Sequence, residues 1–171
     1  MNYLIISRRE KKNNKHIAEK MRQVVNALEH AYEMFNGVAQ KSTDRKTQIL
    51  VFSLATESYQ YYKELVSQVQ VLECKPFLNE KGEETKIEWN VIAMQKERAK
   101  NNTDDILKDC TEIEKKVIKE YRGLLNDPYI LGDHRKLLQQ QLNGLLYAFV
   151  KLKMLKSFSS SSNTLEAGVL F

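Results

Sequence analysis

An internal repeat of a helical hairpin is the feature that most constrains the fold of this chain. Two stretches 89 positions apart carry matching residues: Tyr32, Phe35, Asp44, Lys46 and Ile49 against Tyr121, Leu124, Asp133, Arg135 and Leu138. In each copy an apolar helical stripe ends, a short polar connection follows, and a basic run led by aspartate begins the next stripe. Because a lone hairpin cannot bury its apolar face, two copies predict an all-α, antiparallel four-helix bundle.

Apolar residues at steps of three and four, with their capping residues, set the expected helix boundaries. The four long helices are expected at about 15–40, 44–74, 103–126 and 133–157. The stripe of the second helix is Phe52, Ala55, Tyr59, Tyr62, Val66 and Val69. A short helix over about 87–100 is expected in the crossover between the hairpins. The bundle domain should therefore cover residues 15–157.

The net charge of +5 is concentrated near the N-terminus. Seven of the 27 Lys and Arg residues precede Gln23, against two of the 22 acidic residues, so the rest of the chain is balanced. Residues for contact with an anion are Arg8, Arg9, Lys11, Lys12 and Lys15. No aromatic side chain is interleaved with them to stack on bases, so residues 1–14 are expected to be a solvated, disordered leader without a nucleic-acid partner. A serine-rich tail over 158–171 is likewise expected to be disordered.

The sequence lacks the signatures of several classes of protein. No apolar run approaches the length of about 18 residues that crosses a membrane, and the N-terminal apolar run is too short for a signal peptide. A cytoplasmic location is therefore expected. The sequence has no glycine-rich phosphate loop, nucleophile elbow or zinc-ligand spacing. Its histidines, His16, His30 and His134, are scattered and expected at the surface. These features favour a protein that is not an enzyme and that needs no cofactor.

Glu114 is the one carboxylate expected inside the bundle. It falls at the centre of the face formed by Leu107, Cys110, Val117, Tyr121 and Leu124, and its counterpart in the first hairpin is Val25. A buried carboxylate is costly unless it is hydrogen-bonded or paired. We therefore expect Glu114 to contact a hydroxyl or a cationic side chain, with Tyr32, Tyr59 and Tyr121 as the candidate core tyrosines. The alternative is a vestigial metal ligand or a proton-handling group with a raised pKa.

Part of this pattern resembles an uncharacterised bacterial family of ferritin-like four-helix bundles, a domain of unknown function. The resemblance rests on Cys110, Glu114 and Tyr121, on the runs Leu124-Leu125-Asn126-Asp127-Pro128 and Arg135-Lys136-Leu137-Leu138, and on Gln141-Leu142. In the first half, Tyr32 before Asp44, the exit at Lys75-Pro76, and Trp89 are similar to the same family. The likeness covers about residues 17–156. It implies the fold and brings no established activity.

A dinuclear metal site of the ferritin type needs a Glu from each of two helices and a Glu-x-x-His pair from each of the others. This chain has no Glu-x-x-His pair. Of its helical glutamates only Glu114 occupies a core stripe, whereas Glu29, Glu33, Glu57 and Glu64 fall beside or opposite the stripes. No metal is therefore expected, and Glu114 is the ligand if one is bound.

The leading functional interpretation is a non-enzymatic bundle that acts as a structural or protein-interaction module. A homodimer is expected, because the apolar stripe of the first helix is wide and isologous pairing commonly covers such a strip. Two alternatives remain open. One is a metal-binding or oxidative-stress protein related to ferritins, with a reduced carboxylate site. The other is association with nucleic acid through the basic N-terminal arm.

Overall fold

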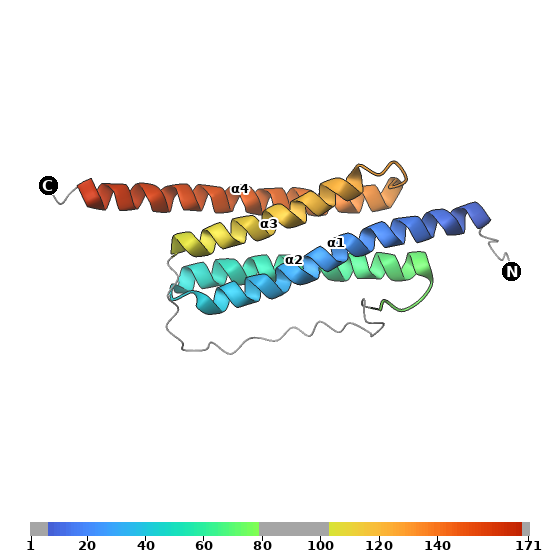
Figure 1. The fold of residues 1–171 in the computed structure, drawn as a ribbon, viewed down its shortest axis with the longest axis horizontal. Coiled ribbons are helices and arrows are strands. Elements are labelled where there is room, and N and C mark those ends of the chain that lie inside the picture. Colours follow the sequence, from blue (N-terminus) through green and yellow to red (C-terminus); the bar gives the residue numbers. More distant parts are fainter. Residues whose placement is uncertain (1–6, 79–102, 169–171) are drawn as a thin grey trace.

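A computed structural model describes residues 7–78 and 103–168, with side chains up to residue 158. These residues form four helices: α1 (Arg8–Lys41), α2 (Arg45–Glu73), α3 (Thr103–Leu125) and α4 (Gly132–Gly168) (Figure 1). The described residues contain no β-strand. The prediction of an all-helical, four-helix protein is confirmed for this part of the chain.

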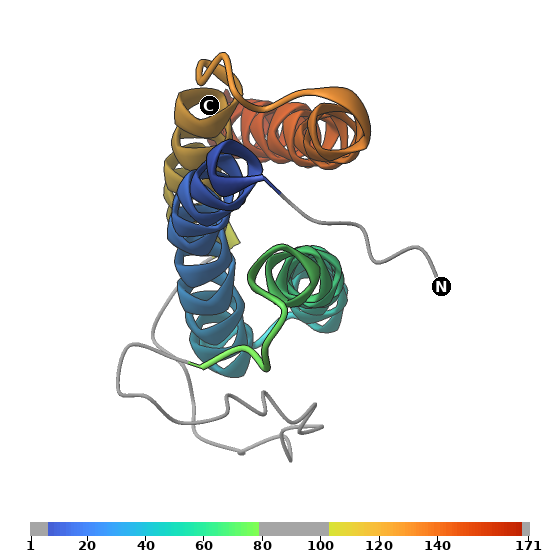
Figure 2. The ribbon, with the colours of Figure 1, turned by 90° about the vertical axis from the view of Figure 1, so that its right-hand side faces the viewer.

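The four helices are not equally close to one another. The backbones of α1 and α2 approach along their length, α1 also packs on α3, and α3 packs on α4. The end view shows that α2 and α4 face each other across the remaining side (Figure 2). None of the described helices is both long enough and apolar enough to cross a membrane.

Local side-chain chemistry explains where the first two helices begin and end. The Ser7 hydroxyl accepts from the Glu10 amide and the Glu10 carboxylate accepts from the Ser7 amide, which is a complete capping box. The Asp44 carboxylate accepts from the backbone and hydroxyl of Thr47 at the start of α2. At the end of α2, Cys74 adopts the left-handed conformation, with φ at 54°. A proline follows two residues later and prevents the helix from continuing.

The connection between α3 and α4 is held by one arginine. Arg135 donates from its guanidinium to the carbonyl oxygens of Ile130, Leu125 and Asp127, at 2.7, 2.8 and 3.2 Å. The last carbonyls of a helix have no partner inside that helix, so these bonds satisfy groups at the end of α3. Gly132 has a positive φ of 56°, which a glycine adopts without strain where α4 begins.

The predicted duplication holds along α1 and α3 and fails where the second helix of each hairpin begins. Phe35 and Leu124 are both buried, as are Val25 and Glu114. Ile49, however, is 59% exposed, whereas its counterpart Leu138 is fully buried. The matching of these two residues was therefore wrong as a statement about the core. α1 ends at Lys41 and α2 begins at Arg45, whereas α3 ends at Leu125 and α4 begins at Gly132, so α2 and α4 do not begin at matching positions of the repeat.

Three other expectations about the helices need correction. Residues 8–14 were expected to be disordered but form the start of α1, because the capping box at Ser7 satisfies free backbone groups there. Residues 158–168 were expected to belong to a disordered tail but continue α4. The buried face of α2 runs through Val51, Leu54, Ala55, Ser58, Tyr62, Leu65 and Val69, so the predicted stripe was rotated by about one residue. The short helix expected over 87–100 lies outside the described residues.

Candidate functional site

A group of polar side chains fills the space between α2, α3 and α4. We call it the polar seam and define it as Glu57, Tyr61, Glu64, Glu114, Tyr121 and Gln141. The side-chain amide of Gln141 on α4 connects that helix to α2 and α3. The Tyr121 hydroxyl donates to Gln141 Oε1 at 2.8 Å, and Gln141 Nε2 donates to Glu64 Oε2 at 2.8 Å. The seam therefore joins the two hairpins by polar contacts between α2, α3 and α4.

Glu114 lies at the centre of the buried face of α3 and is only 1% exposed. Its Oε2 atom has no hydrogen-bond partner among the described residues. The charged group that acts on it is another acid, Glu57 of α2. Burial, and secondly the charge of Glu57, raise the pKa of Glu114 to about 8. Near neutral pH the carboxyl of Glu114 is therefore mostly protonated.

Glu57 and Tyr61 line the same region, one helical turn apart on α2. The Oε1 atom of Glu57 is buried without a hydrogen-bond partner in the described structure, and burial raises the pKa of its carboxyl. Burial also raises the pKa of Tyr61 to about 12, with further contributions from Glu57, Glu64 and Glu114. The pKa of Tyr121 is raised well above its usual value, again mainly by burial. Burial in the seam thus favours the protonated, neutral forms of Glu57, Tyr61, Glu114 and Tyr121.

Among the described residues, the structure shows no hydrogen bond from a partner of the expected kind to Glu114 Oε2. We expected a hydroxyl or a cation, but within the described residues no such group bonds its Oε2 atom and the facing charge is a carboxylate. Among the candidate tyrosines, Tyr121 bonds Gln141. Tyr32 and Tyr59 instead pack on each other, with ring centroids 5.5 Å apart. The structure therefore divides the predicted polar core into a tyrosine pair between α1 and α2 and a separate seam.

Glu57 and Glu64 were missed by the sequence reasoning, which placed them off the apolar stripe of α2. They face α3 and α4 because α2 buries two sides, one against α1 and one along the seam. A second stripe of Glu57, Tyr61 and Glu64 at steps of four and three is visible in the sequence. Such a stripe indicates a surface in most proteins, because acidic side chains are rarely buried.

The seam does not fit a dinuclear metal centre of the ferritin type. Such a centre needs several carboxylates and two histidines that converge on the ions. In the described part of the chain, no group of three or more His, Cys, Asp or Glu side chains is placed to hold an ion. His16 lies elsewhere, with its Nε2 atom 2.7 Å from Asp127 Oδ2. What the seam can do chemically is hold and release protons on Glu57 and Glu114.

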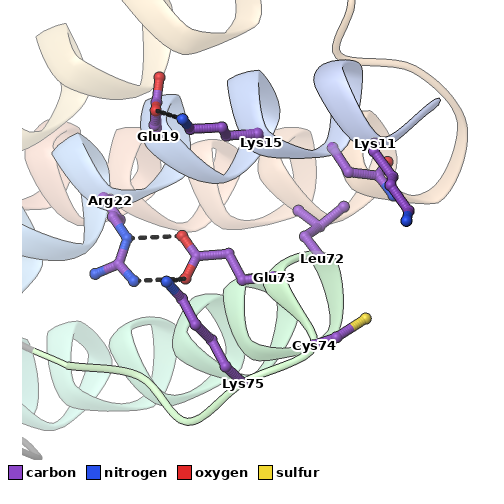
Figure 3. A pocket seen from close by; sticks show the side chains of 9 residues that line it. Lys11, Lys15, Glu19, Arg22, Leu72, Glu73, Cys74 and Lys75 are labelled. Carbon is purple, nitrogen blue, oxygen red and sulfur yellow. Dashed lines mark hydrogen bonds and ion pairs between the residues drawn. The ribbon is translucent and has the colours of Figure 1, made fainter. Parts of the chain in front are cut away.

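A second feature is a groove of about 560 Å³ between the start of α1 and the end of α2 (Figure 3). Arg22 crosses it and makes a two-pronged ion pair with Glu73, at 2.9 and 2.7 Å, while its guanidinium lies 4.6 Å from the Phe77 ring centroid. Lys11 and Lys15 from α1 also line the groove. The charges of Arg22 and Glu73 therefore neutralise each other, whereas Lys11 and Lys15 are exposed.

The basic N-terminal residues are arranged on α1 by helical geometry. Arg8, Lys11, Lys12 and Lys15 follow steps of three, one and three, so they share one face of the helix, and all four are exposed. Arg9 falls on an adjacent face. Of the predicted anion-contact residues the structure therefore brings four together and sets one apart.

A third feature is a groove of about 560 Å³ between α3 and α4. Its apolar lining consists of Ile118, Leu146 and Phe149. Its polar edge carries the four cations Lys115, Lys116, Lys119 and Arg122 and a single acid, Glu112. None of these cations makes an ion pair with a described residue. The groove thus combines an apolar base with an unneutralised basic edge.

Comparison of the chain with models of protein families, with curated proteins and with solved structures finds no match. The ferritin-like resemblance therefore stays a sequence-based expectation. The functional argument has to rest on the three features of the chain itself, namely the seam and the two grooves.

Proposed function

We propose that this protein is a non-enzymatic interaction module and that it binds an acidic amphipathic helix of a partner protein in the groove between α3 and α4. One observation supports the proposal above the others: the groove has an apolar base, and its edge carries four cations against one acid. An amphipathic helix uses its apolar face to fill such a groove. Acidic residues beside that face would meet the basic edge.

The basic edge is built by the register of α3. Lys115, Lys119 and Arg122 are spaced by four and three residues, so they form a line along the helix beside the buried Ile118. Opposite, α4 lines the groove with the apolar side chains of Leu146 and Phe149, which lie three residues apart on that helix. Charge complementarity of this kind speeds association and selects partners more than it raises affinity. The basic edge of the groove therefore selects a partner with negative charge.

A second copy of this chain is a poorer occupant of the same groove. An isologous contact brings each patch against itself, so the cations of α3 would face their own copies. The expected homodimer is therefore proposed to use another surface, and light scattering at high protein concentration tests it. For the fold, we further propose an up-down, antiparallel, ferritin-like bundle. For the source and the location, we propose a bacterial protein of the cytoplasm. The family resemblance and the close packing of α1 on α2 and of α3 on α4 support that arrangement.

The interaction is tested with a designed peptide of about 20 residues, with Leu on one helical face and Glu beside it. Its fluorescence anisotropy is measured against the intact chain, and a peptide with Lys in place of Glu is the specificity control. The groove variant replaces Lys115, Lys119 and Arg122 by Gln. The matched arm variant replaces Lys11, Lys12 and Lys15 by Gln, so both variants remove three positive charges.

We expect the Glu peptide to bind the intact chain and the arm variant equally, and to bind the groove variant at least about tenfold more weakly. The Lys peptide should not bind. Equal loss in both variants would show an effect of net charge alone and would refute the groove. So would equal binding of the two peptides, or no binding of the Glu peptide.

The metal-binding alternative has weaker support. Of the three carboxylates in the seam, Glu64 bonds Gln141, and the remaining two, Glu57 and Glu114, are fewer ligands than a stable site for iron, manganese or zinc requires. Metal analysis after desalting tests it directly. Retention of one of these metals near one equivalent, lost in Glu114→Gln, would replace the interaction module as the better proposal.

A further inference from the structure

The first two turns of α1 form an ordered basic surface. Arg8, Lys11, Lys12 and Lys15 share one face, and this end of α1 projects past the end of α2 (Figure 1). The capping box of Ser7 and Glu10 keeps these residues helical. We call this surface the basic face. A flexible arm would lose conformational entropy on binding, whereas a face already held in a helix has less to lose.

We infer that the basic face binds the phosphate backbone of double-helical nucleic acid without regard to sequence. From Arg8 to Lys15 the helix rises about 10.5 Å, at about 1.5 Å per residue. Duplex DNA carries about one negative charge per 1.7 Å of its axis, so several phosphates lie within that length. The four cations therefore match the length scale and the sign of a duplex backbone.

The cations of the basic face are available for a ligand. The ion pair nearest to them joins Lys15 to Glu19 at 4.0 Å, and both side chains are more than half exposed. Such a surface pair contributes little, and a phosphate group can displace it. Across the neighbouring groove, Lys75 adds a further cation, 3.9 Å from Glu73 (Figure 3). Glu73 itself is already paired with Arg22, so it does not neutralise the basic face.

The neighbouring side chains distinguish a duplex backbone from other anionic partners. No large apolar side chain is exposed on α1 between Arg8 and Glu33. A helix that inserts into a membrane surface presents apolar residues beside its cations, and this face has none. It also has no aromatic side chain on which single-stranded bases stack. Among the described residues, this face offers phosphate contacts alone, and these are available on any duplex.

The test uses the intact chain and a labelled duplex of about 30 base pairs and mixed sequence, at salt concentrations between about 50 and 200 mM. The arm variant, with Lys11, Lys12 and Lys15 replaced by Gln, is compared with the groove variant, with Lys115, Lys119 and Arg122 replaced by Gln. The two variants lose the same charge from different surfaces. Unlabelled duplex, the unlabelled single strand and vesicles containing phosphatidylserine serve as competitors.

We expect duplex binding to fall at least about tenfold in the arm variant and to stay unchanged in the groove variant. The slope of log affinity against log salt should decrease by about 0.9 for each phosphate that the arm variant no longer neutralises. Circular dichroism checks that both variants keep the helical content of the intact chain. Weaker binding by an arm variant that keeps its helicity supports the inference.

Three results would overturn the inference. One is the absence of any duplex complex at low salt. Another is an equal loss of binding in the groove variant, which would attribute the effect to net charge. The third is stronger competition by the vesicles or the single strand than by unlabelled duplex. None of these results bears on the proposed peptide groove. Peptide binding is measured with a different ligand, and it is expected to weaken in the groove variant and not in the arm variant.

Discussion

The two hairpins of this protein bury the same position in different ways. Val25 of α1 and Glu114 of α3 are related by the internal repeat, and both are at most 1% exposed. Val25 is packed among apolar side chains, whereas Glu114 faces the polar seam and the charge of Glu57. At this position the first hairpin therefore has an apolar side chain, and the second hairpin has a buried carboxyl. Among the described residues, the Oε2 atom of that carboxyl has no hydrogen-bond partner.

The difference between the hairpins is concentrated where they meet. Beyond the connections α2 and α4 do not keep the register of the repeat, and the buried face of α4 places Gln141 between Leu138 and Leu145. Gln141 is 2% exposed and bonds both Tyr121 and Glu64. A glutamine is stable there because each end of its amide has a partner. The Oε2 atom of Glu114 has no such partner in the described structure, so this carboxyl is kept neutral by a raised pKa instead.

The largest expected effect comes from exchanging the residues of the repeat. Val25→Glu should lower the free energy of unfolding by about 3 kcal/mol or more, because it buries a carboxyl among apolar side chains. Glu114→Val should leave stability unchanged or raise it by about 1 kcal/mol at neutral pH. Urea denaturation of both variants measures the comparison. If Glu114→Val destabilises the protein as strongly as Val25→Glu, the carboxyl of Glu114 has a partner that outweighs its burial.

Stability should also depend on pH through Glu114. Its pKa is about 8 in the folded protein against an ordinary value of 4.5, so the unfolded chain loses this proton first. Its contribution is complete below about pH 4.5 and declines as the pH rises toward 8. The slope is at most about 1.4 kcal/mol per pH unit. Between about pH 6 and 8 we therefore expect the unfolding free energy to fall by about 2 kcal/mol.

The control for that pH dependence is Glu114→Gln, whose amide cannot ionise. Its unfolding free energy, taken from urea midpoints at several pH values, should be nearly flat over the same range. The raised pKa of Glu57 gives a smaller slope of the same sign, so Glu57→Gln should flatten the curve only in part. A wild-type curve as flat as that of Glu114→Gln would show that the carboxyl is already ionised in the folded state.

The sequence alone predicted the helices more accurately than the site. Stripe periodicity and proline positions located all four long helices, because both depend on local geometry. The central position of Glu114 followed from the same periodicity. The capping box at Ser7 was overlooked, so the basic residues after it were expected in a disordered arm. The second stripe of α2 was missed, because only the packing of three helices shows that Glu57 and Glu64 face inward.

The two hairpins also differ in a single side chain near the connection between their helices. Arg135 donates to three carbonyl oxygens, whereas its counterpart Lys46 is exposed. A lysine cannot reproduce the geometry of a guanidinium, so Arg135→Lys should lower the unfolding free energy by about 1–2 kcal/mol. Lys46→Gln should change it by less than about 0.5 kcal/mol. Thermal denaturation of the pair measures both, and equal effects would contradict a special role for the second connection.

The smallest expected effect concerns the contact between Tyr61 and Gly144. A Cβ atom on Gly144 would overlap the Tyr61 hydroxyl, which lies at the end of a side chain that is only half-buried. Alanine is intrinsically better than glycine inside a helix by about 1 kcal/mol, so displacement of the hydroxyl and the gain in propensity oppose each other. We expect Gly144→Ala alone to change the unfolding free energy by less than about 1 kcal/mol.

Removing the hydroxyl separates the two contributions. In a Tyr61→Phe background the overlapping atom is gone, so Gly144→Ala should become stabilising by up to about 1 kcal/mol. A double-mutant cycle measured by urea denaturation gives the coupling between the two positions. Additive effects would mean that α2 and α4 are not held close at this level of the seam. A clear coupling would instead show that the glycine at position 144 gives Tyr61 its place between the hairpins.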